Sequence, residues 1–434
     1  MQEHLGKPLS LPAGVVYACQ GCGACCRNDW LIGVDARSLA RLGDVEGGRV
    51  DPALPAGKKF VRLPLPLLTG ETHTFARTPG GSCVFLTEER RCAIHLRLGY
   101  AEKPQVCREF PYSFVETPDG IAVGLSFACT AVRGHQGQPL GERVAEIREV
   151  LAGSYRVQRV QEPILLYSGL DIGWDDYRPI ERALLDLLGR EDVPLLQALL
   201  AGTVLITLAV GLAEIERRAA ARGEPARESL RGGLEGLRAD GYRGVLEVAA
   251  RLRYPRRASL AYLAPLYTWV ELSRTRRSRF AIVWSLYRNY WRFRRGRGWL
   301  ADFVTGGAAL DLASVSKVRF STGDAETEQF LRRYWSHVLW RKTLTPVHGV
   351  FRGYHTLLAL WAFMKWCAKL RAHAAGRAET TLEDVKDAVC LVEQRFVLHA
   401  QFARLYTLSP VLTVMADRLY QRPTFARAAV LESA

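Results

Sequence analysis

The residues best able to do chemistry in this sequence are cysteines, and eight of the ten lie within the first 130 positions. Four of them occur in one short run, Cys19-Gln-Gly-Cys22-Gly-Ala-Cys25-Cys26. The glycines allow the backbone to curl, so successive sulfur atoms can approach one centre. The C-x2-C spacing is typical of metal sites, because its tight turn lets two thiolates hold one ion and lets backbone N–H groups point at sulfur. The run therefore predicts a metal centre.

A second group of four cysteines is spread over a longer stretch. Because Cys25 and Cys26 are adjacent, we expect their side chains to diverge, which favours two neighbouring centres or one polynuclear cluster with a spare thiol. Four plus four thiols suits either arrangement. The predicted metal ligands are Cys19, Cys22, Cys25, Cys26, Cys83, Cys92, Cys107 and Cys129.

Two metals compete for such a site. An iron–sulfur cluster, for example of the 4Fe-4S type, is the preferred interpretation, and zinc is the alternative, since tetrahedral thiolate geometry suits both. His95 follows Cys92 by three residues and is expected to donate to a sulfur atom rather than to bind the metal. Cys367 and Cys390 lie on apolar helix faces and are expected in the core.

Composition and the N-terminal residues indicate a folded protein whose cysteines stay reduced. The chain has 434 residues, 48% hydrophobic and 24% charged, which is long enough to bury a core without disulfides. The start, Met1-Gln2-Glu3-His4, has no basic, apolar secretory signal. We therefore expect a cytoplasmic protein, in which clustered cysteines indicate metal or redox chemistry.

The expected fold is mainly α in two domains. Residues 1–150 form a small loop-rich metal-binding domain with short β-hairpins, one around Ser82 to His95 and one pairing Tyr112–Glu116 with Ile121–Phe127. Residues 151–434 form a large all-α domain with helical periodicity almost throughout.

Three helices are predicted in particular. The stripe from Phe330 to Leu339 follows a capping residue, Asp324, and Thr381-x-x-Asp384 is a capping box that precedes the stripe Val385, Val389, Val392 and Phe396. The uncharged stretch Val193 to Ala213 is long enough to cross a bilayer, but its glycines and threonines favour a buried helix. No membrane span is expected.

The formal net charge of +15 raises the question of nucleic acid. The densest basic run, Arg274 to Arg297, interleaves arginines with Trp284, Tyr287, Tyr290 and Trp291, a combination that can bind single strands. A helix with its aromatic side in the core and its arginines in solvent is the simpler interpretation. Nucleic-acid binding is therefore the less favoured alternative.

The cysteine pattern resembles a known family. The motifs C-x2-C-x2-CC, C-x-F-L, C-x-I-H, K-P-x-x-C-R-x-F-P and a final C are similar to those of the YkgJ-type cysteine-cluster proteins, which are described as zinc- or iron-chelating. The resemblance covers Cys19 to Cys129. Besides the eight cysteines, the matching residues are Phe85, Leu86, Ile94, Pro104, Arg108, Phe110 and Pro111.

The whole chain also resembles the flagellin lysine N-methylases. The start Cys25-Cys26-Arg-Asn-Asp-Trp30, the stretch from Phe330 to Trp335 and the helix from Val392 to His399 carry this resemblance. It implies an S-adenosylmethionine-dependent protein lysine N-methyltransferase acting on a protein partner such as flagellin. The chain has no G-x-G-x-x-G motif, so no methyl-donor residues are assigned.

A methyltransferase needs a base or a desolvating pocket to obtain a neutral lysine. Glu393 and His399 are polar groups near an apolar stripe, and a solvated glutamate and a core histidine are their simpler interpretations. The catalytic residues stay unassigned. The alternative to an enzyme is a non-catalytic protein that binds or senses a metal and docks a partner protein.

Overall fold

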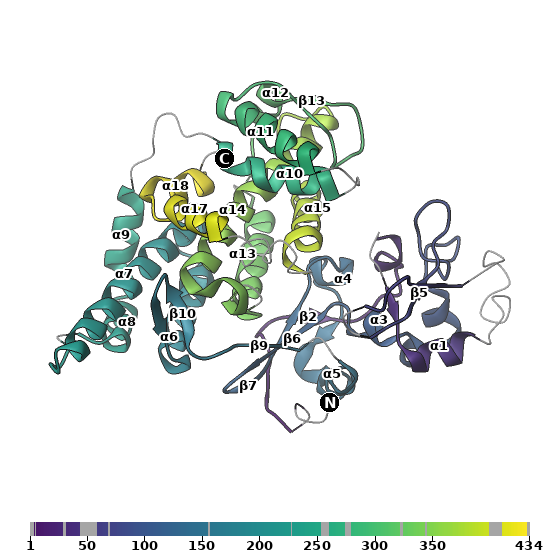
Figure 1. The fold of residues 1–434 in the computed structure, drawn as a ribbon, viewed down its shortest axis with the longest axis horizontal. Coiled ribbons are helices and arrows are strands. Elements are labelled where there is room, and N and C mark those ends of the chain that lie inside the picture. The colour runs from purple at the N-terminus through teal and green to yellow at the C-terminus, as the bar shows by residue number, and fades with distance from the viewer. Residues whose placement is uncertain are drawn as a thin grey trace. The chain divides into compact units, whose positions relative to one another are not determined.

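The computed structural model describes residues 4, 6–28, 32–43, 59–67, 70–154, 157–226, 228–252, 260–273, 279–321, 324–342, 345–398 and 410–431. The chain divides into two compact units, Met1–Arg159 and Val160–Ala434 (Figure 1). The fold is mainly α, and the first unit carries small sheets and short hairpins between its helices, as the sequence predicts.

The first unit contains a four-stranded sheet of order β1-β7-β6-β9. Its central hairpin joins β6 (Tyr112–Thr117) to β7 (Gly120–Leu125), with Tyr112 opposite Leu125. These two strands are almost wholly buried, and they confirm the hairpin predicted between Tyr112 and Phe127. The outer strands β1 (Leu9–Ser10) and β9 (Gln158–Arg159) pair parallel to β7 and β6.

The rest of the first unit consists of short elements. A three-stranded sheet has the order β3-β5-β4, and β2 pairs with β8. The bounds of the remaining strands and helices are β2 Val16–Tyr17, η1 Cys25–Arg27, β3 Gly33–Val34, α1 Ala36–Gly43, β4 Phe60–Arg62, β5 His73–Phe75, η2 Ile94–Leu98, η3 Tyr100–Glu102, α3 Gln105–Glu109, α4 Thr130–Arg133, β8 Gln138–Pro139, η4 Leu140–Arg143 and α5 Val144–Gly153.

The hairpin predicted around Ser82 to His95 is only partly present. A single bridge pairs Leu86 with Cys92, and no strand ladder extends from it in this described segment. The backbone groups that a ladder would use are bonded elsewhere: the N–H of Cys83 donates to the carbonyl of Cys26, and the N–H of Cys92 to that of Gly21. The segment thus pairs with itself only briefly, where Thr87 N–H donates to Arg91 and Ala93 N–H to Phe85, and it pairs with the cysteine run as well.

The second unit is built from helices and two short two-stranded sheets, β10–β11 and β12–β13. Helix α14 (Thr345–Ala374) packs against α7, α15, α18 and β10, and its middle is almost entirely buried. The other bounds are β10 Ile164–Tyr167, β11 Leu170–Ile172, α6 Trp174–Gly189, α7 Leu195–Ala221, α8 Leu230–Ala239, α9 Arg243–Arg251, η5 Leu260–Leu263, α10 Ala264–Ser273, α11 Arg279–Arg295, β12 Trp299–Leu300, β13 Leu310–Asp311, α12 Leu312–Ser316, α13 Ala325–Trp340, α15 Leu382–Val392, η6 Glu393–Val397, α17 Pro410–Tyr420 and α18 Pro423–Leu431.

A glycine sets the path of α14. Gly349 interrupts the helix with φ +69°, a conformation that side chains rarely tolerate. A Cβ atom at this position would lie 2.2 Å from the carbonyl oxygen of Leu165. Glycine is therefore required where β10 packs against this helix.

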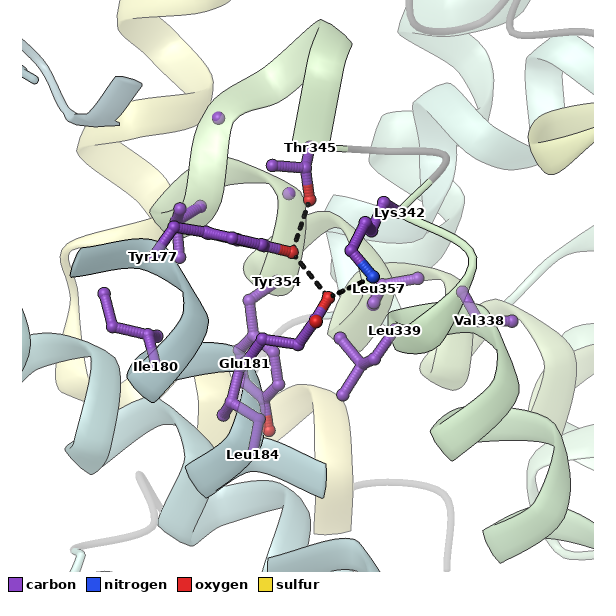
Figure 2. Close-up of a pocket in the computed structure, with 13 residues that line it drawn as sticks. Tyr177, Ile180, Glu181, Leu184, Val338, Leu339, Lys342, Thr345, Tyr354 and Leu357 are labelled. Carbon is purple, nitrogen blue, oxygen red and sulfur yellow. Dashed lines mark hydrogen bonds and ion pairs between the residues drawn. The ribbon is translucent and has the colours of Figure 1, made fainter. Parts of the chain in front are cut away.

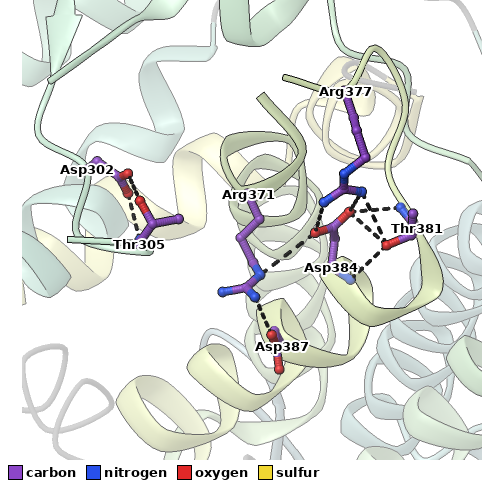
Figure 3. Close-up of polar contacts among 7 residues, drawn as sticks. All are labelled: Asp302, Thr305, Arg371, Arg377, Thr381, Asp384 and Asp387. Atoms are coloured by element: carbon purple, nitrogen blue, oxygen red, sulfur yellow. Dashed lines mark hydrogen bonds and ion pairs between the residues drawn. The ribbon is translucent and has the colours of Figure 1, made fainter. Parts of the chain in front are cut away.

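The capped helices form as predicted. Asp324 accepts hydrogen bonds from the first-turn N–H groups of α13, and Thr381 and Asp384 make the reciprocal capping box of α15. Figure 3 shows Arg377 donating to the carboxylate of Asp384, while Arg371 reaches both Asp384 and Asp387. The predicted stripe of α15 and the turn after it is buried at Val385, Val389, Val392 and Phe396.

Helix α7 contains the uncharged stretch considered above. It starts after Pro194 and packs against α6, α8, α9, α14 and α18. Among the described helices it alone is long and apolar enough to cross a membrane, and half of its most apolar window is buried. Leu208 and Ile215 are exposed on its outer side.

The two buried histidines of α14 predict acid sensitivity of the second unit. Burial lowers the pKa of both His348 and His355 from 6.5 to about 4, so the folded unit keeps them neutral while the unfolded chain protonates them. The unfolded state then binds more protons between pH 6.5 and about 4. The free energy of unfolding should fall in this window by about 1.4 kcal/mol per pH unit for each imidazole as pH decreases.

Replacing one imidazole isolates its share. His355 is stacked on Phe351 and Tyr420, so His355→Phe should keep the packing and reduce the pH slope by about one proton. Denaturant unfolding followed by circular dichroism at several pH values measures this. An unchanged slope in His355→Phe would contradict the assignment.

Candidate metal centre

The cysteine run is shaped by two glycines in left-handed conformations. Gly21 and Gly23 both have φ +62°, and a Cβ atom on Gly23 would lie 2.4 Å from the carbonyl oxygen of Arg90. The chain then enters the short η1 turn, in which the N–H of Cys26 donates to the carbonyl of Gly23. The turn brings the double cysteine against the segment that carries Cys83 and Cys92.

Four thiols meet at this place. The Cys26 side chain is hydrogen-bonded to those of Cys25, Cys83 and Cys92. Cys26, Cys83 and Cys92 are buried, and Cys25 packs against the same core cluster, which includes Phe75. The centre of the site is therefore also the centre of a hydrophobic core.

The expected divergence of Cys25 and Cys26 is wrong, because their thiols are in contact. The double cysteine thus supplies two donors to the same cluster.

Three further thiols surround this group. Cys107 and Cys129 interact electrostatically with Cys25, and Cys19 interacts with Cys129. Burial raises the pKa of Cys107 well above its usual value and that of Cys129 to about 12. Of the eight predicted ligands, four are therefore in contact and three more lie within electrostatic range. Cys22 differs from the other predicted ligands because its side chain is exposed.

The pKa values of the four thiols around Cys26 differ. The hydrogen bond from Cys26 lowers the pKa of Cys92 to about 6 and that of Cys25 to about 7, and it also lowers the pKa of Cys83. The pKa of Cys26 itself is raised, chiefly by its hydrogen bond to Cys25. The lowered pKa values of Cys25, Cys83 and Cys92 favour the thiolate, the form that binds metals.

Backbone N–H groups point at the sulfur atoms of two inner cysteines that lie outside the C-x2-C motifs. The sulfur of Cys83 accepts from the N–H of Phe85, and that of Cys92 from the N–H groups of Ile94 and His95. Such hydrogen bonds stabilise sulfur-bound negative charge and tune a metal centre.

A buried cation lies beside the thiols. The Nζ atom of Lys103 is 3.9 Å from the sulfur of Cys19 and lies over the ring of Tyr100. Burial alone would lower the pKa of Lys103, but Coulombic interactions with Cys19, Cys25, Cys107 and Cys92 raise it overall. Lys103 is not among the ligands or donors predicted from sequence. Its signal was its place at the start of Lys103-Pro104-x-x-Cys107.

His95 also lies against the thiols. Its Nδ1 atom is 3.7 Å from the sulfur of Cys19, as expected for a donor to sulfur. Burial, with the nearby charges of Lys103 and Arg91, lowers its pKa, so the imidazole is neutral at pH 7.

The donor set fits a thiophilic metal in chemistry. It offers thiolates, hydrogen-bond donors to sulfur, one cation and an apolar surrounding. Within the described residues, no three Cys, His, Asp or Glu side chains are already arranged to hold an ion. Coordination would therefore require the thiols now hydrogen-bonded around Cys26 to rotate toward a common point.

Comparison with known proteins agrees with this site. Residues 18–126 match the CxxCxxCC family model. That family is described as a "Putative zinc- or iron-chelating domain". The match covers about a quarter of the chain and includes all the predicted ligands except Cys129. No curated protein and no solved structure matches the chain.

The other residues considered from sequence lie elsewhere. Cys367 is buried on α14, as expected, and Cys390 is half-buried on α15. Trp30 and His399 fall outside the described residues. Glu393 is not a solvated glutamate: it is fully buried.

Glu393 is committed to an ion pair in the helical unit. Arg341 donates to both of its carboxylate oxygens, one at 2.9 Å, and the hydroxyl of Tyr334 donates to it at 3.2 Å. Arg341 is buried as well. The pair joins α13 to η6 and supports the structure of the unit rather than proton transfer to a substrate.

The same unit has a small cavity that is lined mostly by apolar residues and has a hydrogen-bonded polar group in its wall (Figure 2). Tyr177 and Lys342 contact the carboxylate of Glu181 at 2.8 and 3.0 Å, and Thr345 lies 3.4 Å from the tyrosine hydroxyl. The cavity volume is about 30 Å³. This is room for a water molecule and far too little for S-adenosylmethionine.

The ion pair gives a stability prediction. Glu393→Gln leaves the Arg341 charge buried without its counter-charge and should cost about 3–5 kcal/mol of unfolding free energy. The double variant Arg341→Met and Glu393→Leu removes both charges and should recover most of that loss. Denaturant titration measures both. A Glu393→Gln variant as stable as the parent would contradict the structural role.

Proposed function

We propose that residues 1–159 bind a metal centre through the thiols grouped around Cys26. The observation that carries this proposal is the direct contact of Cys26 with Cys25, Cys83 and Cys92, from two separate segments of the chain. An apolar residue would pack in the core as well as a buried thiol does. A group of thiols, by contrast, is well suited to bind a metal.

An iron–sulfur cluster is the preferred occupant, and zinc is the alternative. A single structural zinc ion takes four ligands, while here three further thiols lie within electrostatic range of the four that are in contact or of one another. Backbone N–H groups and the Lys103 cation favour a centre whose sulfur atoms carry extra negative charge, as in an iron–sulfur cluster. When bound, such a cluster would supply electron transfer or structural cross-linking.

Metal analysis of the wild-type protein tests this proposal. Protein purified without oxygen should contain iron and show broad visible absorption from iron–thiolate bonds. A colourless protein with stoichiometric zinc would select the alternative metal. Protein that holds neither metal after reconstitution with iron and sulfide or with zinc would overturn the proposal.

Replacing Cys26 tests the centre of the site. Cys26→Ser should lose most of the bound metal and destabilise the first unit, because binding free energy on the order of 10 kcal/mol is coupled to folding of such sites. Cys390→Ser, half-buried in the other unit, is the matched control and should keep the metal. Metal content and thermal unfolding measure both. Full metal content in Cys26→Ser would contradict a central role.

We also propose a catalytic use for the whole chain: methyl transfer from S-adenosylmethionine to lysine of a protein such as flagellin. The support is the sequence resemblance carried by the double cysteine and by the stretches around Phe330 and Val392. A non-catalytic metal-binding or metal-sensing protein is the alternative. The 30 Å³ cavity of the described helical unit is too small to be the binding site of the methyl donor.

Methyl transfer can be measured directly. Metal-loaded protein incubated with methyl-labelled S-adenosylmethionine and flagellin, or with a lysate, should label lysine in a protein band. Cys26→Ser should reduce labelling if the centre is needed, and Cys390→Ser should not. Absence of labelling with fully loaded protein would favour the non-catalytic alternative.

A further inference from the structure

Helix α11 differs from an ordinary surface helix, because it exposes aromatic side chains to the solvent. Its inward side carries Ser285, Asn289 and Phe293, all at most 2% exposed. The Asn289 amide donates to Thr268 and Glu271 of α10. The buried side is therefore mixed: Asn289 is held by hydrogen bonds, and Phe293 packs on Tyr267 and Trp366.

Its outward side is apolar and aromatic. Val283, Trp284 and Tyr287 are 66%, 55% and 56% exposed, and Leu286 and Tyr290 are each 37% exposed. The expectation that the aromatic side lies in the core is wrong for these residues. The α10 contacts instead select the side of Asn289, because Asn289 finds its hydrogen-bond partners there.

The exposed rings form a connected series. Trp284 stacks on Tyr287 with ring centroids 6.0 Å apart and an interplanar angle of 28°, and Tyr287 contacts Trp291. Tyr290 also contacts Trp291, edge to face. The series leaves flat ring surfaces open along about two turns of the helix.

Arginines continue this face. The guanidinium groups of Arg294 and Arg295 lie 5.4 and 5.2 Å from the ring centroid of Trp291. Among the described residues, neither has a carboxylate partner, and residues 279–297 include no Asp or Glu at all. Arg288 is different, since it pairs with Glu271. Positive charge at the end of the helix is thus available to an anion.

We propose that this face of α11 binds single-stranded nucleic acid. Bases would stack on the series Trp284, Tyr287 and Tyr290, and phosphates would pair with Arg294 and Arg295, the combination that single-strand binding surfaces use. Charge complementarity favours a polyanion because the segment has arginines without acidic residues. Bases suit it better than acyl chains, since its surface is formed mainly by rings with polar edges.

Binding of a fluorescein-labelled poly-dT oligonucleotide, followed by anisotropy with the full chain, tests the proposal. The double variant Trp284→Ala and Tyr287→Ala should weaken binding by about tenfold or more, because each stacked base contributes appreciably. Ile215→Ala, an exposed apolar residue on α7, is the control and should change nothing. Circular dichroism should be unaltered in both, as the side chains are exposed.

A second pair of variants tests the pairing with phosphates. Arg294→Gln with Arg295→Gln should lower the slope of log affinity against log salt by about 0.7 for each phosphate that is no longer neutralised. Arg243→Gln with Arg251→Gln on α9 removes the same charge from another exposed site and should leave the slope nearly unchanged. Equal effects of both pairs would mean that only the net charge matters and would overturn the proposal.

Vesicles distinguish a membrane from a nucleic acid. Phosphatidylglycerol vesicles should not shift the emission of wild-type protein relative to Trp284→Phe. Vesicle binding that depends on Trp284, without oligonucleotide binding, would overturn the proposal in favour of a lipid surface. Oligonucleotide binding that is unaffected by the aromatic double variant would overturn it as well.

Discussion

The contact of Cys26 with three other thiols is the interaction on which the first unit depends. It ties the cysteine run to the segment of Cys83 and Cys92, and the backbone repeats the connection where the Cys83 N–H donates to the Cys26 carbonyl. The segments joined in this way have only isolated bridges in place of ladders. Cross-linking through a metal would supply the rigidity that the short elements lack.

The second unit depends on different physics. Its central helix α14 is buried along most of its length, so apolar burial and packing stabilise it without a metal. Two buried cations of the second unit have polar partners: Lys365 donates to the carbonyl of Val430, and Arg341 pairs with Glu393. These contacts fix which faces of the helices meet, because a misplaced helix would leave a charge unpaired.

The exposed apolar residues of this unit differ between α7 and α11 in how they are grouped. On α7, Leu208 and Ile215 are single exposed residues on a helix whose inner side is apolar, which is ordinary for a protein surface. On α11 the exposed apolar residues are contiguous and mostly aromatic, while polar Ser285 and Asn289 are buried. A contiguous patch of this kind is characteristic of an interaction surface.

The sequence by itself determined the elements whose causes are local. Asp324 and the Thr381–Asp384 box specify helix starts through hydrogen bonds within four residues, and the β6–β7 hairpin is specified by its turn and alternating strands. The density of cysteines likewise indicated a metal site, since spacing alone restricts what such a run can do.

Only the tertiary structure decided what depends on distant partners. Residue spacing does not reveal that Cys25 and Cys26 converge on Cys83 and Cys92, or that Lys103 lies beside Cys19, because these contacts join separate segments. Periodicity shows that α11 has two faces, but the hydrogen bonds of Asn289 to α10 decide which face is buried. Burial is a property of the neighbours that a residue meets, and a single segment does not specify them.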